Sequence, residues 1–190
     1  MKKKVAVAMS GGVDSSLTAA LLIEQGYDVI GVTMTLSDES REAGGSTAVS
    51  DAKKVADALN IPHYVVNYHK KFKDDVIKYF ISEYAKGRTP NPCVRCNNTV
   101  KFGSLLKDCL ELGADCVATG HYARIEQDEK TGRYLLKKGL DVRKDQSYVL
   151  YTLTQDVLKH FMLPLGNYSK EKTRELAGKM NLPVANKPES

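Results

Sequence analysis

The stretch Val5-Ala6-Val7-Ala8-Met9-Ser10-Gly11-Gly12-Val13-Asp14-Ser15 stands near the start of this 190-residue chain and is followed by Leu17-Thr18-Ala19-Ala20-Leu21-Leu22. The valine-rich run predicts a buried strand, and the run of Leu and Ala predicts a helix. The two glycines between them predict a tight turn, because glycine tolerates positive φ and lets a ligand approach the backbone. The stretch therefore predicts a strand–turn–helix unit in which the N–H groups of a helix start form an anion site.

Polar side chains in the same turn suit a phosphate ligand. Ser10, Ser15 and Ser16 add hydroxyl donors, and the carboxylate of Asp14 could hold a hydrated Mg²⁺. The turn is not a Walker loop, since no lysine follows Gly12. We interpret it as a phosphate loop of another kind. The alternative is a glycine turn that joins a strand to a helix and binds nothing.

The composition indicates one globular domain with a core of ordinary size, since 42% of the residues are hydrophobic. No apolar run is long enough for a membrane helix, and Lys2-Lys3-Lys4 is followed by too few apolar residues for a signal peptide. We therefore expect a cytoplasmic protein with no membrane partner, whose four cysteines serve thiol or metal chemistry rather than disulfides. The net charge of +5 is ordinary for a soluble protein, and it also suits a polyanion such as RNA.

The rest of the chain alternates between strand-like and helix-like patterns. We expect strands at 28–34, 63–67 and 116–119, helices at 13–25, 50–59, 70–84, 98–112 and 170–180, and a polar loop at 37–50. A hairpin over 123–137 and a helix over 144–153, with Asp145 as its N-cap, complete the pattern. Because consecutive strands are separated by helices, the predicted fold class is α/β, with a doubly wound parallel sheet.

Ligands of such sheets bind at the carboxyl ends of the strands. Met34 ends a predicted strand, so we expect it beside the phosphate loop, where its backbone could meet an adenine. His121 follows another strand end and could contact phosphate or move a proton. The alternative for His121 is a purely structural hydrogen bond, and the sequence does not favour either.

Cys93 and Cys96 form a C-x-x-C pair within 87–97, where two prolines and a glycine predict a rigid, non-helical loop. Such a pair can be half a zinc site, a redox pair, or a nucleophile with a neighbour. A zinc site needs about four N or S ligands, and the sequence has no second C-x-x-C. We expect a nucleophile at Cys96, because a helix start follows it and three basic residues lie nearby: Arg88, Arg95 and Lys101. A pair of structural thiols is the alternative.

The other two cysteines are expected to be inert. Cys109 lies near the apolar face of a predicted helix, and Cys116 begins a predicted buried strand. Both should behave as small hydrophobic residues with raised pKa, so that alkylation would label Cys96 first and Cys93 next.

The order of these motifs resembles that of a known family. S-G-G-V-D-S-S resembles the PP-loop of the ATP pyrophosphatase superfamily, which has a Rossmann-like domain of the adenine nucleotide alpha-hydrolase type and cleaves ATP between the α- and β-phosphates. The chain also contains T-P-N-P-C-V-R-C-N, G-A-D-C-V-A-T-G-H-Y-A-R, K-D-Q-S-Y, P-L-G and L-P-V-A-N-K. With these motifs it closely resembles the tRNA-specific 2-thiouridylase family, from Lys4 to Ser190.

The resemblance implies an enzyme that binds tRNA and ATP–Mg²⁺, adenylates O2 of the wobble uridine with release of pyrophosphate, and replaces that oxygen with sulfur from a cysteine persulfide. A sulfur-relay protein or a cysteine desulfurase would be the donor. By motif, the implied ATP-binding residues are Ala8, Met9, Ser10, Gly11, Gly12, Val13, Asp14, Ser15, Met34 and Gly120. The implied tRNA-binding residues are Asn91, Pro92, Cys93, Lys144, Asp145 and Gln146. Cys96 matches the nucleophilic cysteine of the family. We also take Cys93 as a catalytic candidate, and His121 and Arg124 as further candidates.

The chain departs from the family pattern in two ways. Many members carry Asp at the position of Cys93, so this thiol could instead resolve a persulfide or ligate an iron–sulfur cluster with Cys96 and one more ligand. Members also continue into a segment that bears a second catalytic cysteine. We therefore expect an N-terminal portion, with a catalytic domain at 1–165 and the start of a linker at 166–190, that does not sustain repeated thiolation alone.

Two other functions stay open at this point. Another PP-loop enzyme that adenylates a small metabolite would not need Cys93 and Cys96. A non-catalytic tRNA-binding fragment would bind tRNA without releasing pyrophosphate from ATP.

Overall fold

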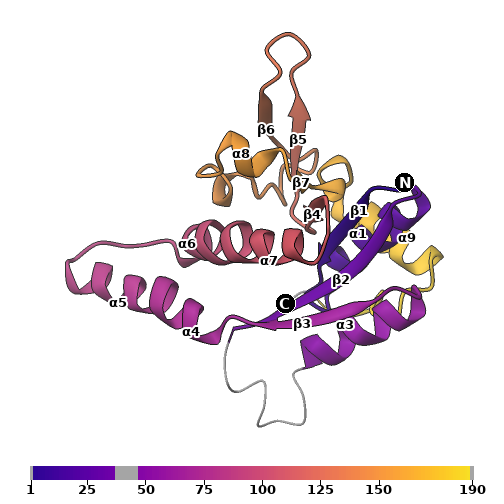
Figure 1. The fold of residues 1–190 in the computed structure, drawn as a ribbon, viewed down its shortest axis with the longest axis horizontal. Helices are drawn as coiled ribbons and strands as arrows, with labels where there is room; N and C mark the ends of the chain where they lie inside the picture. The colour runs from indigo at the N-terminus through magenta and orange to yellow at the C-terminus, as the bar shows by residue number, and fades with distance from the viewer. Residues whose placement is uncertain (1, 37–46, 189–190) are drawn as a thin grey trace.

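A five-stranded parallel sheet forms the centre of the molecule (Figure 1). The structure, a computed structural model, describes residues 2–36 and 47–188. The strands lie in the order β3-β2-β1-β4-β7 and every pairing is parallel. Their bounds are β1 (Lys4–Ala8), β2 (Asp28–Thr35), β3 (His63–Asn67), β4 (Cys116–Ala118) and β7 (Phe161–Met162). The predicted α/β class with a parallel sheet is confirmed.

Helices cover both faces of the sheet, because successive residues of a strand point to opposite faces. Val5 and Val7 of β1 belong to a core that includes residues of α1 (Val13–Glu24), α3 (Thr47–Ala58) and α9 (Lys170–Lys179). Ala6, which lies between them, belongs to a second core with the helical run from Pro92 to Glu111. The sheet is therefore doubly wound, as predicted (Figure 1).

Most of the predicted elements are present with small shifts at their ends. The strand at 63–67 has the predicted bounds, and α3 begins at Thr47 rather than at residue 50. The remainder of the expected polar loop, 37–46, lies outside the described residues. The helix expected over 70–84 is a continuous run of α4 (His69–Phe72), a π-helical turn (Lys73–Ile77) and α5 (Lys78–Ala85).

The segment expected to be a rigid loop is helical from Pro92 onwards, so that prediction was wrong there. α6 (Pro92–Cys96) continues through a π-helical stretch (Asn97–Ser104) into α7 (Leu105–Glu111). Asn91 starts this helix, because its side-chain oxygen accepts hydrogen bonds from the N–H groups of Cys93 (3.0 Å) and Val94 (3.2 Å). Pro92 occupies the first helical turn, where its fixed φ is favourable and its missing N–H costs nothing. Both cysteines therefore lie on the first turns of a helix.

The helix expected over 144–153 is reduced to a single 3₁₀ turn, Ser147–Val149. The carboxylate of Asp145 accepts hydrogen bonds from the N–H of Gly139 (2.9 Å) and from the hydroxyl of Ser147 (2.8 Å). Asp145 thus ties this segment to the end of a neighbouring strand instead of capping a regular helix, and side-chain bonds of this kind compete with helix formation.

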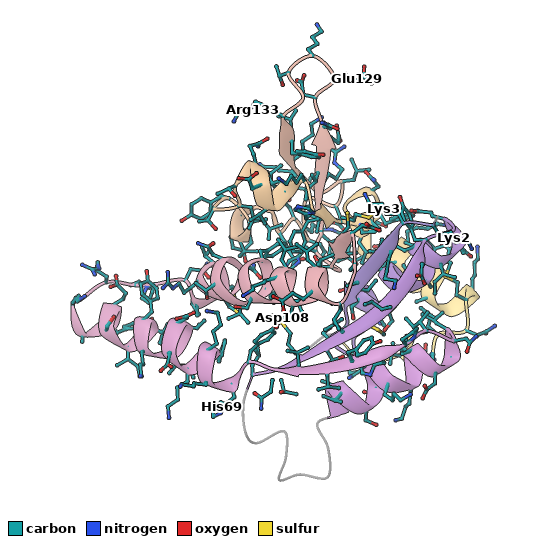
Figure 2. The ribbon with its side chains drawn as sticks, viewed as in Figure 1. Lys2, Lys3, His69, Asp108, Glu129 and Arg133 are labelled. Atoms are coloured by element: carbon teal, nitrogen blue, oxygen red, sulfur yellow. The ribbon has the colours of Figure 1, made fainter. Side chains whose placement is uncertain are left out.

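The predicted hairpin is confirmed. β5 (Ala123–Gln127) and β6 (Tyr134–Lys138) form an antiparallel pair that rises away from the main sheet (Figure 1). Its tip carries Glu129 and Arg133, well away from the sheet (Figure 2). After the hairpin, the chain continues through α8 (Gln155–Leu158), β7 and a 3₁₀ turn at Pro164–Asn167.

The segment that follows residue 165 packs on the sheet rather than standing apart from it. Ala177 of α9, and Leu182 and Val184 after it, are buried in the same core as Val5. The expected division at residue 165 stays a prediction. Among the described residues, no helix is long and apolar enough to span a membrane.

Candidate functional site

The glycine loop joins the end of β1 to the start of α1, and its backbone is confined to one path. Gly11 has φ +71°, and a Cβ built there would lie 2.3 Å from the carbonyl oxygen of Ala48. Only glycine fits at this point. Gly12 is the N-cap of α1 and has no side chain to cover the first N–H groups of the helix. The first turn of α1 is therefore left uncapped by any side chain, and an anion at this helix start stays a prediction.

The serines of the loop divide into two kinds. Ser16 is fully buried, and its hydroxyl donates to the carbonyl of Gly12 at 2.8 Å. Ser15 is also buried, and its Oγ accepts a hydrogen bond from the N–H of Ser10 at 3.1 Å. Ser15 and Ser16 thus hold the loop in shape, and of the three predicted hydroxyl donors only the exposed Ser10 faces the cavity beside the loop.

Gly120, which the family motif implies is an ATP-binding residue, lies against the loop. A Cβ there would approach the carbonyl carbon of Asp14 and the amide nitrogen of Ser15, both at 2.9 Å. Met34 lies near the end of β2, paired with Val66, and packs against the second core. Neither residue lines the cavity at the loop, so their expected contact with an adenosine stays a prediction.

The carboxylate of Asp14 already has two partners. The ammonium of Lys170 donates to Oδ1 at 2.7 Å and to Oδ2 at 2.8 Å, and the hydroxyl of Tyr122 donates to Oδ1 at 2.9 Å. The side chain of Lys170 is only 13% exposed, whereas that of Asp14 is 33% exposed, so the ammonium is largely removed from water and the carboxylate is partly solvated. A Mg²⁺ ion at Asp14 would have to compete with this lysine.

A cavity of about 410 Å³ opens above the loop. Ser10, Gly12, Val13 and Asp14 line it on the loop side, and Gln146 on the other. Four basic side chains also line it: Lys144, Lys170, Arg174 and Lys187. Since Asp14 is the only acidic residue in the described lining, the cavity has an excess of positive charge, which suits a polyphosphate.

Sequence reasoning missed Lys170, Arg174 and Lys187, because they lie in a segment interpreted as the start of a linker. One indication was available. Ser169 reads as an N-cap, and its hydroxyl accepts from the N–H of Lys172 at 3.1 Å. A lysine in the first turn of a helix is unfavourable with the helix dipole, so Lys170 needed an acidic partner elsewhere in the fold.

Lys187 forms hydrogen bonds that hold the loop in place. Its ammonium donates to the carbonyl of Gly11 (3.1 Å) and to the carboxylate of Asp51 (2.7 Å). This ammonium holds the pKa of Asp51 below its ordinary value. The carbonyl of Lys187 in turn accepts from Arg174 at 3.2 Å, so the end of the described chain is tied to α9 and to the loop.

The two thiols of the C-x-x-C pair have different surroundings. Cys93 is exposed on the first turn of α6, whereas Cys96 is only 8% exposed. Burial raises the pKa of Cys96 above its ordinary value, and the charge of Lys101 only partly opposes this. The expectation of a favoured thiolate at Cys96 was therefore wrong for this conformation, and the labelling order that rested on it loses that support.

The expected basic surroundings of the thiols are mostly engaged elsewhere. The guanidinium of Arg88 donates to the carboxylate of Glu83 at 2.5 and 2.6 Å. That of Arg95 donates to the carbonyl of Asp75 at 3.0 Å and lies 5.0 Å from the centre of the Tyr79 ring. Only the charge of Lys101, of the three predicted activators, acts on Cys96. The other two cysteines are buried as predicted, and burial raises the pKa of Cys109 to about 12.

We call α6, with the helical run that continues from it to Glu111, the cysteine helix. A smaller cavity of about 240 Å³ lies at its start. Asn91, Arg95, Tyr79 and Tyr151 are among its lining residues. Tyr151 is 70% exposed, and Tyr148 nearby in the chain is 62% exposed. The exposed rings give this region surfaces on which a base could stack.

His121 has a structural environment. Its Nδ1 lies 2.7 Å from the hydroxyl oxygen of Thr119, and its ring packs against Phe102 with centroids 5.8 Å apart. Burial, with Lys101 nearby, lowers the pKa of His121 to about 3. A neutral histidine outside the cavity lining favours the structural alternative.

Of the remaining candidates, two line the cavity and two are engaged elsewhere. Lys144 and Gln146 line the cavity, and Gln146 is fixed by accepting from the N–H of Tyr122 at 3.0 Å. Asp145 is engaged with Gly139 and Ser147, as described above. Arg124 donates to the carbonyl of Lys138 (3.0 Å) and to Glu126 (3.1 Å), so its charge is used within the hairpin.

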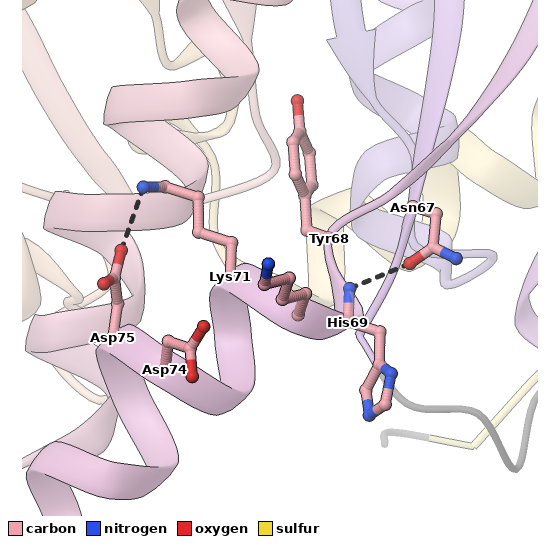
Figure 3. Close-up of a pocket in the computed structure, with 7 residues that line it drawn as sticks. Asn67, Tyr68, His69, Lys71, Asp74 and Asp75 are labelled. Carbon is pink, nitrogen blue, oxygen red and sulfur yellow. Dashed lines mark hydrogen bonds and ion pairs between the residues drawn. The ribbon is translucent and has the colours of Figure 1, made fainter.

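Two larger cavities lie elsewhere and lack convergent chemistry. One, of about 710 Å³, lies beyond β3, where Lys71 pairs with Asp75 at 2.9 Å on the same helix (Figure 3). The other, of about 900 Å³, lies at the amino ends of β1 and β2, the opposite end of β1 from the glycine loop, and Lys2 and Lys3 are among its lining residues (Figure 2). Their charges are paired or scattered, so neither competes with the loop as the main site.

The described residues contain no group of three or more His, Cys, Asp or Glu side chains arranged to hold a metal ion. For an iron–sulfur cluster, Cys93 and Cys96 would thus need a further ligand from outside this part of the chain. For Mg²⁺, one carboxylate is enough, because this ion is commonly held by one or two carboxylates together with substrate phosphates. Asp14 fits that requirement once Lys170 moves from it.

A doubly wound parallel sheet with a glycine loop at the end of β1 and a basic cavity above it defines an α/β domain of the Rossmann-like kind. The chain belongs to the family described as the tRNA methyl transferase HUP domain, which matches residues 3–190.

Curated relatives sharpen that assignment. The chain is 58% identical over 198 residues to tRNA-specific 2-thiouridylase MnmA 1 of Caldanaerobacter subterraneus subsp. tengcongensis, with 100% of this chain and 54% of the relative covered. It is 54% identical over 196 residues to tRNA-specific 2-thiouridylase MnmA of Clostridioides difficile, with the same coverage. The resemblance inferred from the motifs is confirmed. The chain spans about half the length of these relatives.

Solved structures share the fold at low identity. The U34-tRNA thiolase NcsA from Methanococcus maripaludis with its 4Fe–4S cluster has a TM-score of 0.62 at 21% identity, covering 98% of this chain and 60% of that one. A 4-thiouridine synthetase–RNA complex with bound ATP has a TM-score of 0.63 at 19% identity, covering 98% of this chain and 43% of that one. NMN synthetase from Francisella tularensis has a TM-score of 0.58 at 18% identity, covering 100% and 66%. The predicted PP-loop fold is confirmed.

Proposed function

We propose that this chain is the ATP- and tRNA-binding part of an enzyme that replaces O2 of a tRNA wobble uridine with sulfur. The observation that carries the proposal is the basic cavity at the start of α1, whose charge and size suit a nucleoside triphosphate. The 54–58% identity to 2-thiouridylases supports this choice of substrate and reaction. The neighbour with bound ATP supports ATP as the nucleotide.

In the first step the uridine oxygen attacks the α-phosphorus of ATP. A bond forms between O2 and that phosphorus, the bond to the oxygen that bridges to the β-phosphorus breaks, and N3 of the uridine gives up its proton to water. Pyrophosphate leaves with the electron pair of the broken bond, so negative charge grows where the loop amides and the basic side chains of the cavity lie. A Mg²⁺ ion at Asp14 would supply further neutralisation of the phosphates.

In the second step the outer sulfur of a persulfide on Cys96 attacks C2 of the adenylated uridine. A C2–S bond forms, the C2–O bond breaks, and AMP leaves with its electrons. The thiolate of Cys93 then attacks the inner sulfur, which releases the thiouridine and leaves a disulfide between Cys93 and Cys96. An external thiol reduces this disulfide, and a sulfur-relay protein or a cysteine desulfurase reloads Cys96.

The tRNA contacts are proposed at Asn91 and Pro92, at the start of the cysteine helix, and at Lys144 and Gln146 in the basic cavity. Asn91 lines the 240 Å³ cavity with Tyr151, whose exposed ring can stack on a base. This arrangement would place a base within reach of Cys93, which is two residues from Asn91.

Mass spectrometry of tRNA nucleosides tests the proposal. The chain is incubated with ATP, Mg²⁺, a persulfide donor and unmodified tRNA, and the nucleosides are analysed after digestion. We expect 2-thiouridine that depends on ATP and is lost in Cys96→Ser. The absence of any thiolated product together with tight tRNA binding would overturn the proposal in favour of a binding fragment.

A second candidate is an adenylating enzyme for a small metabolite, which the shared fold with NMN synthetase favours. Such an enzyme has no use for the two thiols. If ATP-dependent pyrophosphate release proceeds fully without tRNA, and Cys93→Ala with Cys96→Ala leaves it unchanged, this candidate replaces the first.

A further inference from the structure

Lys170 is held in a position that its own helix does not favour. It occupies the first turn of α9, where the positive end of the helix dipole repels a cation. Its backbone N–H donates to the carboxylate of Asp141 at 3.0 Å, which anchors this end of the helix. The side chain is thereby directed into the basic cavity, far in sequence from the loop that it meets.

The pairing of Lys170 with Asp14 leaves the cavity rich in positive charge. The two side chains neutralise each other, but Lys144, Arg174 and Lys187 also line the cavity, and Asp51 is the acidic partner of Lys187. The side chain of Lys170 is only 13% exposed, and a largely buried charge is costly when it loses an acidic partner. Another anion at the start of α1 would offset that cost when Lys170 leaves Asp14. The phosphates of a nucleotide bound at the start of α1 would be that anion.

A Walker loop carries its phosphate-binding lysine within the loop, next to the second glycine. The loop of this chain has Val13 and Asp14 in that place and no lysine. Lys170 reaches the same region from 156 positions later in the chain. Its ammonium lies within hydrogen-bond distance of Asp14, the second residue of α1, which is where phosphates at a helix start are found.

We propose that Lys170 is the phosphate-binding lysine of this loop, with Asp14 as the counter-ion that holds it until the β- and γ-phosphates of ATP arrive. This inference rests on the proposed use of ATP. When the phosphates enter, the ammonium transfers from the carboxylate to them, and the carboxylate becomes available to Mg²⁺. When the bond between the α-phosphorus and the bridging oxygen breaks, Lys170 then neutralises the charge on the departing pyrophosphate.

Calorimetric binding of three probes tests the inference: ATP, AMP and inorganic pyrophosphate, each with and without Mg²⁺. In Lys170→Met we expect the affinity for ATP and pyrophosphate to fall at least about tenfold, because a charge-assisted hydrogen bond is lost. The affinity for AMP, which lacks the outer phosphates, should change less than about twofold. Lys170→Arg should keep part of the pyrophosphate affinity. Lys172→Met is the matched control, since Lys172 lies on the same helix and pairs with Glu175 at 3.0 Å.

The double variant Asp14→Asn with Lys170→Met separates phosphate binding from mere neutralisation of Asp14. We expect it to bind pyrophosphate without Mg²⁺ as weakly as Lys170→Met does. If it binds as tightly as the unaltered chain, Lys170 only balances Asp14 and the inference is overturned. Equal loss of AMP and ATP affinity would also overturn it. If the unaltered chain binds neither ATP nor pyrophosphate, the proposed function falls as well, whereas ATP binding that ignores Lys170→Met removes this inference alone.

Discussion

The glycine loop and the cysteine helix both place a helix start at a candidate site, but they leave different groups open. At the loop, the capping residue is Gly12, and no side chain covers the first N–H groups of α1. At the cysteine helix, the oxygen of Asn91 accepts from the N–H groups of Cys93 and Val94. The first helix start is therefore open to a ligand, while the second is closed by its own cap.

The basic side chains around the two helix starts differ in the same way. Distant basic residues converge on the loop, with Lys170 and Lys187 both in contact with it. Around the cysteine helix, Arg88 and Arg95 are bound to partners of the preceding helix. A helix start thus becomes a site only when its N–H groups stay uncovered and the tertiary fold brings complementary charge.

The largest expected effect is that of Gly11→Ala in the open helix start. The new Cβ would lie 2.3 Å from the carbonyl of Ala48 at a φ of +71°, so the loop must move. We expect ATP affinity to fall roughly 100-fold, because even a small displacement of positioning groups has such effects. We also expect a loss of about 1–3 kcal/mol in the free energy of unfolding. Calorimetry and chemical denaturation measure the two.

Gly132→Ala is its control. Gly132 has φ +69° in the hairpin, but a Cβ there meets nothing within 4 Å. Gly132→Ala should lower the free energy of unfolding by about 1 kcal/mol and leave the affinity for ATP unchanged. If Gly11→Ala behaves like Gly132→Ala, the tight path of the loop does not matter for binding.

The second effect is that of Asp14→Asn. The variant removes the carboxylate that Lys170 and Tyr122 share, so we expect pyrophosphate release at limiting Mg²⁺ to fall about tenfold or more. The free energy of unfolding should fall by about 1–3 kcal/mol, because Lys170 keeps a largely buried charge with a weaker partner. Asp57→Asn is the control, since it removes an exposed partner of Lys53 on α3. It should change pyrophosphate release and the free energy of unfolding much less than Asp14→Asn does. Full pyrophosphate release in Asp14→Asn would exclude a metal-binding role for Asp14.

The contrast also explains what the sequence could predict. The loop depends on local chemistry: two glycines, a strand before them and a helix after them are adjacent in the chain, so its geometry was predictable. The burial of Cys96 and the pairing of Lys170 with Asp14 depend on segments that are far apart in sequence. The start of the cysteine helix was predictable in principle, since Asn91 and Pro92 are a favourable N-cap and first-turn pair, but the prolines were interpreted only as helix breakers.

Thiol reactivity tests the closed helix start. Cys93 is exposed and Cys96 is buried, so brief alkylation near neutral pH should label Cys93 first, Cys96 next, and Cys109 and Cys116 last. Because burial raises the pKa of Cys96, its thiolate fraction is small at neutral pH, and its labelling rate should keep rising with pH beyond the ordinary thiol value of 9.0. Peptide mass spectrometry over a pH series measures this.

Lys101 gives the control for that explanation. Its charge favours the Cys96 thiolate, so Lys101→Met should slow labelling of Cys96 further and leave Cys109 unchanged. If Cys96 reacts faster than Cys93 in the unaltered chain, the thiol of Cys96 is accessible in solution and its burial is transient.

The smallest expected effect concerns the salt dependence of tRNA binding, which decides whether the cavity of the loop also takes part in binding RNA. Lys144 lines that cavity beside Gln146. If Lys144 contacts an RNA phosphate, Lys144→Met should weaken tRNA binding a few-fold and reduce the slope of log K against log salt by about 1. Arg124→Met should change the slope less, because its guanidinium is already bound to Glu126 and to a carbonyl within the hairpin. Lys107→Met, which removes an exposed charge paired with Glu111 on α7, serves as the control. An unchanged slope in Lys144→Met would assign this cation to the nucleotide alone, and tRNA would then approach through the region of Asn91 and Tyr151, at the closed helix start.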